Sequence, residues 1–297
     1  MDTALLEDFL ALARAMNFSR AAETRNMTQP AFSRRIRSLE DALGTPLVSR
    51  TTRQIALTPA GRAFQPRAEA IVRMLADARH AVLEAAGRAE RSLTLAATHA
   101  LSYTFVPRWL TRVAGPSEVG TLNMVSDSHR QCLRLMQDGE ASFFICHRGM
   151  TSAPALPEKQ FRAHPVGADR LVPLCAPDAD GQPRWRLDRT EPGAPFLAYG
   201  SASGLHTILE THWASRGRPK LRRAMQSMLA ATNLEMAKEG QGVAYLPLSL
   251  AEDELALGRL VRATDETHDI PVEVVIHRPR ARLTPHCERF WDMVTGN

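Results

Sequence analysis

The stretch from Phe18 to Leu43, FSRAAETRNMTQPAFSRRIRSLEDAL, decides the fold of the N-terminal part of the chain. It predicts two short helices joined by a tight turn, because Ser19 and Thr28 are residue types that cap the first backbone N–H groups of a helix. Pro30 falls in the first turn of the second helix, where its missing donor costs little. Apolar residues then recur at steps of four, three and four, at Phe32, Ile36, Leu39 and Leu43. The pattern predicts a helical hairpin with one buried face.

The other face of the second helix is polar and basic. Its candidate DNA-contacting residues are Thr28, Gln29, Pro30, Ser33, Arg34 and Arg37. A helix-turn-helix protein places the N-terminal residues of such a helix on base edges in the major groove. Periodicity alone leaves one alternative open, an ordinary helical hairpin whose charged face meets water. A preceding helix over residues 4–16, with an apolar stripe of its own, would brace the pair into a three-helix head.

A resemblance favours the DNA-binding interpretation. The string of Phe18, Ala21–Ala22, Gln29–Pro30, Ser33–Arg34, Ile36, Leu39–Glu40, Leu43–Gly44, Leu47 and Arg50 resembles, without a gap, the N-terminal signature of LysR-type transcriptional regulators. The resemblance implies double-stranded DNA as a partner. Residues 1–62 fit this role, since they hold nine arginines, no lysine and six acidic residues, a net charge of 9 − 6 = +3.

A small β-hairpin is expected after the head. Residues 46–50 and 54–57 can pair as short strands, with residues 51–53 as the tip of a wing. Arg50 and Arg53 would there reach phosphate or a minor groove, because arginine is favoured in narrow grooves. Solvated surface arginines on a hairpin are the alternative.

Thr58–Pro59 predicts the start of a long helix. Its apolar positions alternate steps of four and three, the heptad rule of a helix that pairs with a copy of itself: Phe64, Ala68, Ile71, Leu75, Ala78, Val82 and Ala85. LysR-type regulators have their dimerising linker helix at this place. Pro66 departs from the pattern. It should remove one hydrogen bond and bend the helix, or delay its straight part to about residue 67.

From Leu93 onward strands and helices alternate, which predicts an α/β domain with a parallel sheet and right-handed crossovers. Strands are expected near residues 92–97, 121–126, 142–146, 170–177, 195–197, 222–227, 240–247 and 271–277. Helices are expected near 103–113, 128–138 and 204–216, before Glu239, and around Phe290 and Trp291. GQGVAYLP at 240–247 is similar to a signature of the LysR-type effector domain, which implies two lobes resembling periplasmic binding proteins.

The predicted fold is therefore α/β with an all-α N-terminal head. Residues 1–58 form a winged helix-turn-helix, 59–87 the linker helix and 88–297 the effector domain. Lobe I takes about 92–160 plus 270–297, and lobe II about 161–269. By resemblance, such a protein assembles as a dimer of dimers (a homotetramer), binds a pseudo-palindromic site with half-sites near one helical turn apart, and contacts RNA polymerase.

Ligands of open α/β sheets bind beyond the carboxyl ends of the strands, at a topological switch point. The candidate effector residues at such ends are Thr98, His99, Ser102, Ser126, His147, Tyr199, Ser201 and Ser203. Their hydroxyls and imidazoles suit a small anionic metabolite but do not name one. For each residue, an ordinary hydrogen-bonded loop side chain is the alternative.

A narrower resemblance concerns the signal. AATHALS at 96–102, CAPD at 175–178 and CERFW at 287–291 are similar to hypochlorite-responsive LysR-type regulators, which read oxidation. Sulfoxidation makes a methionine polar and can repack a cleft. Of the clustered Met225, Met228 and Met236, Met228 best matches the family position after Ser in S-M-x-x-L; core packing is the alternative. A Cys132–Cys146 disulfide, as in peroxide-sensing relatives, is a second redox variant, although the sequence does not show that their Cβ atoms meet.

Other functions find less support. No nucleophile-elbow, P-loop, dinucleotide-binding or metalloprotease motif is present, so neither an enzyme nor a cofactor is predicted. The four cysteines lack metal-type spacing, and no signal peptide or apolar stretch near 18 residues is apparent. The expectation is a cytoplasmic protein without a membrane partner. A periplasmic solute-binding protein or an α/β enzyme would also leave residues 1–87 unexplained.

Overall fold

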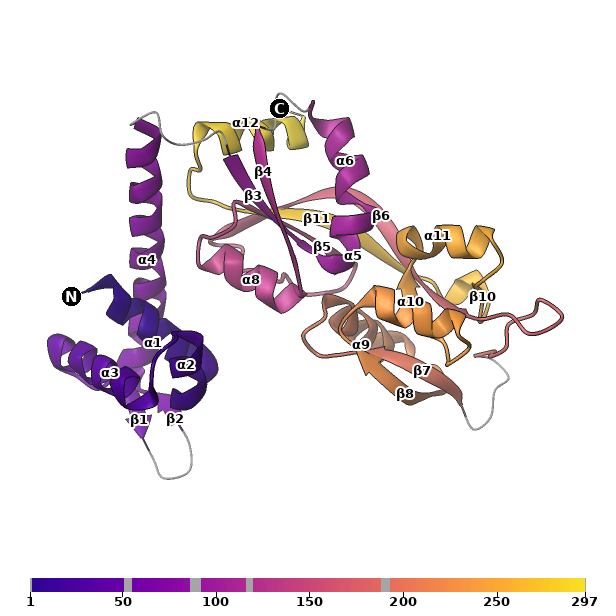
Figure 1. Cartoon of the computed structure of the whole chain (residues 1–297), viewed down its shortest axis with the longest axis horizontal. Coiled ribbons are helices and arrows are strands. Elements are labelled where there is room, and N and C mark those ends of the chain that lie inside the picture. The colour runs from indigo at the N-terminus through magenta and orange to yellow at the C-terminus, as the bar shows by residue number, and fades with distance from the viewer. Residues whose placement is uncertain (1, 51–54, 86–91, 116–119, 188–192, 297) are drawn as a thin grey trace. The chain divides into compact units, whose positions relative to one another are not determined.

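The computed structural model describes residues 2–50, 55–85, 92–115, 120–187 and 193–296. They form two compact units. The first holds the helical head and the long helix α4, and the second, from Ser92 onward, is the regulatory unit (Figure 1).

The head is the predicted three-helix assembly. Its helices are α1 (Thr3–Ala15), α2 (Phe18–Thr24) and α3 (Gln29–Leu43). The apolar stripe of α3 is buried as predicted, with Phe32, Ile36 and Leu39 at its centre. These side chains pack against α1 and α2 in one core.

The helix starts differ in detail from the prediction. Asn17, not Ser19, caps α2, because its extended backbone lets its side-chain oxygen accept from Arg20 N at 3.0 Å. The prediction of Ser19 was wrong by two residues. Thr28 occupies the cap position of α3, but its hydroxyl makes no capping bond. Its carbonyl accepts from Phe32 N at 3.0 Å instead.

A buried carboxylate holds the three helices of the head together. Asp8, on α1, is fully buried and accepts from Arg25 Nε at 2.8 Å and from Arg35 Nε. Arg25 also donates to Glu7 at 2.6 Å. Arg35 is therefore engaged within the head, in contrast to its exposed neighbours Arg34 and Arg37.

Replacing Asp8 with alanine is expected to destabilise the head by about 3 kcal/mol, because two guanidinium groups lose a buried partner. Hydrogen exchange measures this directly. Amides of α1 to α3 should exchange about a hundredfold faster. Asp41→Ala removes an exposed carboxylate from α3 and is the matched control, expected to change protection by less than about 0.5 kcal/mol. Equal effects of both substitutions would contradict this role of Asp8.

The wing forms as predicted where it is described. Strands β1 (Val48–Arg50) and β2 (Ile55–Leu57) pair antiparallel, with Val48 opposite Leu57. Glu40 Oε1 on α3 accepts from Leu47 N at 2.8 Å and from Val48 N at 3.0 Å, which fixes β1 against α3. The tip with Arg53, and the side chain of Arg50, lie outside the described part of the chain.

Helix α4 (Pro59–Ala85) starts where Thr58–Pro59 predicted and continues through Pro66. Thr58 Oγ1 accepts from Gly61 N at 3.0 Å, as expected of a cap.

The apolar stripe of α4 divides in two. Phe64, whose ring lies 5.4 Å from that of Phe9, and the buried Ala68 complete the core of the head. Beyond them the stripe is exposed: Ile71 is 41%, Leu75 51% and Val82 68% accessible. The structure thus leaves an apolar surface on α4 that no described residue of this chain covers.

The regulatory unit is built on a mixed seven-stranded sheet. Its strands are β3 (Ser92–Thr98), β4 (Thr121–Asp127), β5 (Phe143–Gly149), β6 (Phe161–Cys175), β9 (Ala244–Pro247), β10 (Val261–Arg262) and β11 (Ile270–Pro279). The order is β10-β6-β11-β5-β3-β4, with β9 also paired to β6. The two strands β7 (Ala194–Tyr199) and β8 (Leu221–Ser227) form a separate parallel pair.

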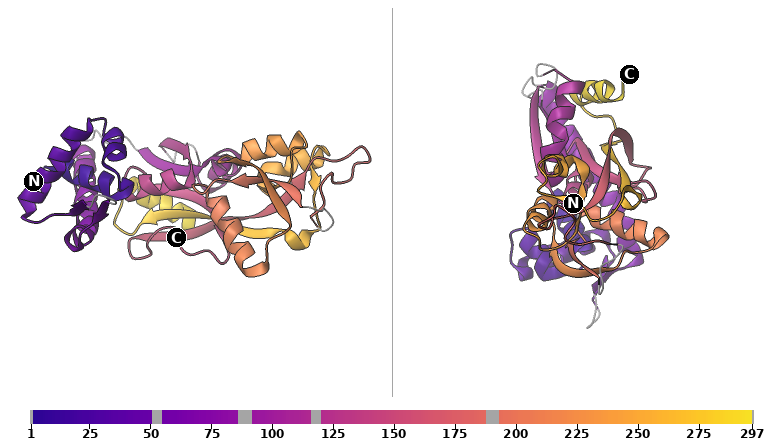
Figure 2. Two further views of the ribbon diagram at one scale, coloured as in Figure 1. Left: turned by 90° about the horizontal axis from the view of Figure 1, so that it is seen from below. Right: turned by 90° about the vertical axis from the view of Figure 1, so that its right-hand side faces the viewer.

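The parallel prediction is confirmed only in part. β3 is parallel to β4 and β5. The long strands β6 and β11 pair antiparallel and run side by side from one lobe into the other (Figure 2). β11 is also antiparallel to β5, so the prediction of an all-parallel sheet was wrong for the crossing strands.

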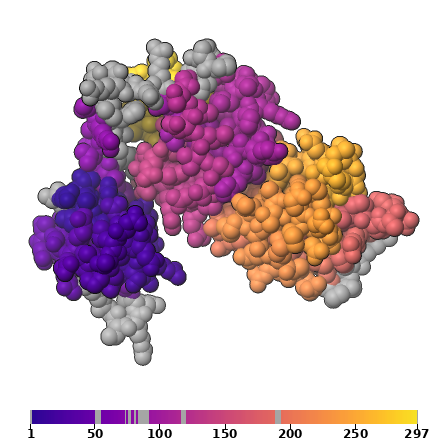
Figure 3. Space-filling view, viewed as in Figure 1, coloured from indigo at the N-terminus to yellow at the C-terminus, as the bar shows by residue number. Residues whose placement is uncertain are grey.

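Helices cover both lobes. They are α5 (His99–Thr104), α6 (Val106–Val113), α8 (His129–Gln137), α9 (Gly204–Arg216), α10 (Ala230–Lys238), α11 (Leu248–Ala256) and α12 (Pro285–Thr295), with a 3-10 turn at Glu266–His268. The single helix expected over 103–113 is two helices that begin earlier, at His99. Helix α11 was not predicted. Figure 3 shows lobe I mainly in magenta and lobe II mainly in orange.

Each lobe has its own aromatic core. Phe143 and Phe290 pack in lobe I, with ring centroids 5.1 Å apart. Trp213 packs between Phe196 and Tyr245 in lobe II. Among the described helices, none is both long enough and apolar enough to cross a membrane.

Candidate functional site

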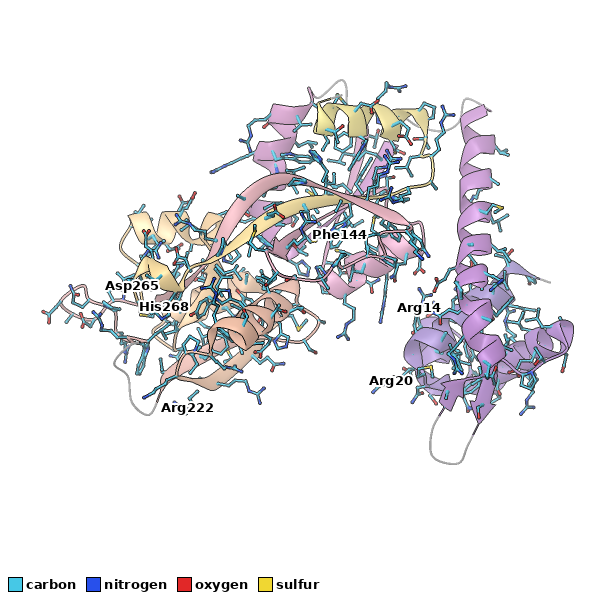
Figure 4. The ribbon with its side chains drawn as sticks, turned by 180° about the vertical axis from the view of Figure 1, so that it is seen from behind. Arg14, Arg20, Phe144, Arg222, Asp265 and His268 are labelled. Atoms are coloured by element: carbon cyan, nitrogen blue, oxygen red, sulfur yellow. The ribbon has the colours of Figure 1, made fainter. Side chains whose placement is uncertain are left out.

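The residues that the sequence predicted to contact DNA lie at the start of α3 and along its outer face. Thr28, Gln29, Pro30, Arg34 and Arg37 are exposed, and Ser33 is half-buried. Their side chains are held on a helix whose opposite face is anchored in the head core. A rigid helix with an amide, hydroxyls and cations on its exposed face can donate hydrogen bonds to base edges and phosphates. Arg20 on α2, which sequence reasoning missed, extends outward from the head as well (Figure 4).

Several predicted effector residues meet at the carboxyl ends of β3 and β4. Ser126 Oγ lies 3.0 Å from His99 Nδ1 and 2.9 Å from Ser102 Oγ. Beside this triplet is a cavity of about 40 Å³, lined by Thr98, His99, His147, Ser203 and Met228 among others. We call it the strand-end cleft. It has room for about three water molecules or a small ion.

Tyr199 and Ser201 do not line the strand-end cleft. Ser201 lines a larger neighbouring cavity, and Ser203 lines both. Tyr199 is buried in lobe II, where its hydroxyl donates to Tyr245 O at 2.9 Å. Tyr199 is therefore not brought together with the other predicted cleft residues.

Met228 differs from the two other methionines of lobe II. Met228 is 40% exposed and lines the strand-end cleft, whereas Met225 and Met236 pack partly buried against an apolar core. Its sulfur lies so close to Gly200 that a Cβ there would collide with it. An oxygen added to this sulfur would thus form where the loop after β7 is tightly packed.

A buried hydrogen-bond network joins the two lobes beside the cleft. Asp169, on the crossing strand β6, accepts from Ser249 Oγ of α11 at 2.6 Å. The same oxygen, Oδ2, lies 3.3 Å from His147 Nε2 of β5. Although burial favours the protonated carboxyl, the bonds from His147, Ser249 and the Arg170 amide hold the pKa of Asp169 below its usual value. No sequence signal pointed to this network, because its members are far apart in the chain.

The cysteines are poor redox candidates. Cys132 and Cys146 are free and buried. Burial raises the pKa of Cys132 to about 12, and burial together with Cys132 raises the pKa of Cys146 as well. Since the thiolate is the species that reacts with oxidants, both groups are deactivated at neutral pH.

Comparisons with known proteins cover both units. Residues 3–62 match the family described as bacterial regulatory helix-turn-helix protein, lysR family, and residues 86–297 match the LysR substrate binding domain. The HTH-type transcriptional regulator YjiE of Escherichia coli (strain K12) is 27% identical over 292 residues, which cover 98% of this chain and 93% of YjiE.

Two solved structures of similar length share the fold. Vibrio fischeri DarR in complex with DNA superposes with a TM-score of 0.57 at 27% identity, covering 99% of this chain and 98% of DarR. Full-length HypT from Salmonella typhimurium, described as a hypochlorite-specific LysR-type transcriptional regulator, gives a TM-score of 0.59 at 27% identity. That match covers 100% of this chain and 98% of HypT.

Proposed function

The chain belongs to the LysR family of bacterial transcriptional regulators, and on that premise we propose that it binds a pseudo-palindromic promoter site as an oligomer and responds to an oxidant of the hypochlorite class. It is a regulator with a DNA-binding and an effector-binding domain, not an enzyme. The observation that carries the proposal for DNA is the exposed polar face of α3. We place its action in the cytoplasm, where bacterial promoters lie.

The exposed stripe of α4 supports an oligomer. Ile71, Leu75 and Val82 are exposed to water in the single chain. Pairing with α4 of a second copy would bury these side chains, and that burial would stabilise a dimer. Two such helices place two heads on one duplex, so a two-fold symmetric operator follows. Pairing of dimers into a tetramer, and contact with RNA polymerase, complete the proposal by family analogy.

For the signal, the position of Met228 supports the oxidant. The strand-end cleft admits a species of a few heavy atoms, and the partly exposed Met228 is one of its lining residues. Oxidation would make that side chain polar and bulkier against Gly200. The alternative is a small anionic metabolite in the inter-lobe cleft. The larger neighbouring cavity, of about 830 Å³ and lined from both lobes, has room for such a molecule, whereas the strand-end cleft of about 40 Å³ does not.

Gln29→Ala is expected to relax base preference, because a glutamine that contacts adenine contributes roughly 1–3 kcal/mol of discrimination. Binding to a library of single-base operator variants measures this. Arg37→Ala is the matched contrast: loss of a phosphate contact should weaken binding to all variants evenly and reduce the slope of log K against log salt by about 0.9. Arg53→Ala is expected to behave like Arg37→Ala. If Gln29→Ala left every preference intact, α3 would not read bases through this residue.

Met228→Ile is expected to abolish the oxidant response of DNA binding while leaving untreated binding unchanged. The measurement compares DNA binding before and after a hypochlorite pulse, and again after treatment with methionine sulfoxide reductase, which should restore the untreated state. Met236→Ile, a partly buried position in the lobe II core, is the control and should respond as the wild type does. A full response in Met228→Ile would remove Met228 as the sensor.

A further inference from the structure

We propose that lobe II contains a ligand site of its own, for an organic phosphate ester whose body is apolar or aromatic. The site is a pocket of about 260 Å³ between the β7–β8 pair and α9, and all of its lining residues fall within 196–226. We call it the lobe II pocket. Among the described residues, none lines both this pocket and either of the two cavities described above. Its binding of a ligand depends neither on DNA nor on the proposed oxidant response.

The floor of the lobe II pocket is apolar. Phe196 of β7 and Leu209 and Trp213 of α9 line it and are buried. The rings of Phe196 and Trp213 have centroids 5.6 Å apart. Tyr199 also lines the pocket, but its hydroxyl is engaged in the core, where it donates to Tyr245 O at 2.9 Å. A floor of this kind favours an apolar or aromatic body.

The volume suits a small ligand. About 260 Å³ lies just below the range of roughly 300–1,000 Å³ that is typical of sites for drug-sized molecules. A body of about ten non-hydrogen atoms, such as a bicyclic aromatic ring, therefore fits the pocket, with its charged group at the rim.

The rim of the lobe II pocket is basic. The eight residues 216–223, from the end of α9 into β8, include no acidic residue and five exposed cationic ones: Arg216, Arg218, Lys220, Arg222 and Arg223. Two of them, Arg218 and Arg223, line the pocket, and Glu210 is the carboxylate among the described lining residues. Such an excess of positive charge favours an anionic ligand.

Arg218 is positioned by an aromatic ring. Its guanidinium carbon lies 4.8 Å from the centroid of the Trp213 ring. Its ion pair with Glu210 is long, at 3.5 Å, and the two side chains are 50% and 44% exposed, so water screens the pair. A guanidinium stacked on a ring face keeps its N–H groups available for an oxyanion.

Arg223 supplies the second cation. It lies opposite Phe196 in the β7–β8 ladder, so both side chains lie on the same face of the pair. Arg223 Nη1 lies 3.4 Å from Gln226 Oε1, beyond the usual N–H···O range of about 2.7–3.2 Å, so this contact holds the guanidinium only weakly. Two guanidiniums at one rim match the three terminal oxygens and the double charge of a phosphate ester.

The lobe II pocket adjoins the loop after β7. A Cβ at Gly200 would lie 3.4 Å from Gln226 Nε2 and would collide with Met228 Sδ. Gln226 lines the lobe II pocket and Met228 lines the strand-end cleft. A ligand against Gln226 would therefore contact a residue that packs on the same glycine as Met228.

Isothermal titration of the full-length protein with 2-naphthyl phosphate tests the proposal. At pH 8 the ester is a dianion, because the second pKa of a phosphate monoester is about 6. We expect saturable binding of one ester per chain. 2-Naphthol lacks the charge and inorganic phosphate lacks the apolar body, so each should bind at least about tenfold more weakly.

Three variants of the lining test the contacts. Arg223→Ala should weaken binding of the ester about tenfold or more, as loss of charged hydrogen bonds predicts. Glu210→Gln removes the opposing carboxylate and should tighten binding about two- to fivefold. Gln226→Trp places an indole at an exposed position of the lining and should abolish binding.

Arg222→Ala is the matched control for Arg223→Ala. Arg222 is exposed and precedes Arg223 on β8, but it lies opposite Pro195, so its side chain is on the other face of the strand. Figure 4 shows it extending outward from lobe II. Its loss removes the same charge and should change binding by less than about twofold, because salt screens a charge outside the pocket.

Four results would contradict the proposal. No saturable binding of the ester, or unchanged binding by Gln226→Trp, would overturn the site. Equal effects of Arg222→Ala and Arg223→Ala would overturn the assigned contact. Equal binding of 2-naphthol would overturn the anion preference, and equal binding of 2-naphthoate, a monoanion with the same body, would overturn the preference for phosphate. Unchanged thermal unfolding of each variant shows that the fold is retained.

Discussion

Replacing Leu75 with aspartate should convert the protein to monomers and weaken its binding to an operator by about a hundredfold or more. Burying a leucine contributes roughly 1.5–3 kcal/mol for each protomer, and the substitution would also bury a charge. Two heads linked by a dimer bind far more tightly than one, by factors of about 10²–10⁴. Sedimentation velocity at micromolar concentration measures the first effect, and DNA titration the second.

Ala70→Asp is the matched control for Leu75→Asp. Ala70 is exposed on α4 but lies about 140° around the helix from Leu75, at 100° per residue, so its new charge stays in water. It should leave both oligomer and DNA binding intact. A dimer that survives Leu75→Asp would show that the exposed stripe of α4 is not the interface.

Acidification should destabilise the regulatory unit by roughly 2 kcal/mol for each of two histidines between pH 7 and pH 5. Burial, aided by neighbouring positive charge, lowers the pKa of His129 and of His277 to about 4. In the unfolded chain each binds a proton below about pH 6.5. Between pH 6.5 and 4 the unfolded state therefore holds more protons, so stability is full above this window and is lost as the pH falls through it.

Tryptophan fluorescence isolates this effect, because all four tryptophans, Trp109, Trp185, Trp213 and Trp291, lie in the regulatory unit. Urea unfolding followed at pH 7 and pH 5 gives the two stabilities. Working at or above pH 5 avoids most of the titration of Asp169, whose lowered pKa makes its contribution disappear only in stronger acid. In His277→Gln the loss between the two pH values should be about half. The same loss in both proteins would mean that His277 does not titrate as described.

The sequence predicted best where one long periodic pattern met clear end signals. The stripes of α3 and α4 and the Thr58 cap are of this kind. It failed at Ser19, because Asn17 is an equally good cap two residues away. It also failed at the crossing strands β6 and β11, because an apolar run does not show whether a strand pairs parallel or antiparallel. The short helix α11 was also missed. It begins directly after the buried strand β9, and the apolar residues of the helix continue those of the strand without a turn signal between them.

The cleft residues were predicted because they follow the carboxyl ends of predicted strands. The structure brings three of them, His99, Ser102 and Ser126, into contact. The hydrophobic pattern did not predict which charged residues are buried. Asp8 lies in a helix and Asp169 in a strand whose other buried residues are mostly apolar. Their hydrogen-bond partners come from other parts of the chain and are brought close only by tertiary packing. The larger cavity beside the strand-end cleft lies between segments that are far apart in the sequence, so the composition of no single segment predicts it.

We propose that the head reads DNA sequence as part of a symmetric oligomer. Selection of bound duplexes from a random DNA pool by the full-length protein tests it without assuming a target gene. We predict enrichment of two inverted half-sites about one helical turn apart, lost at the base contacts in Gln29→Ala. Enrichment of a single asymmetric element, or of no sequence at all, would contradict it.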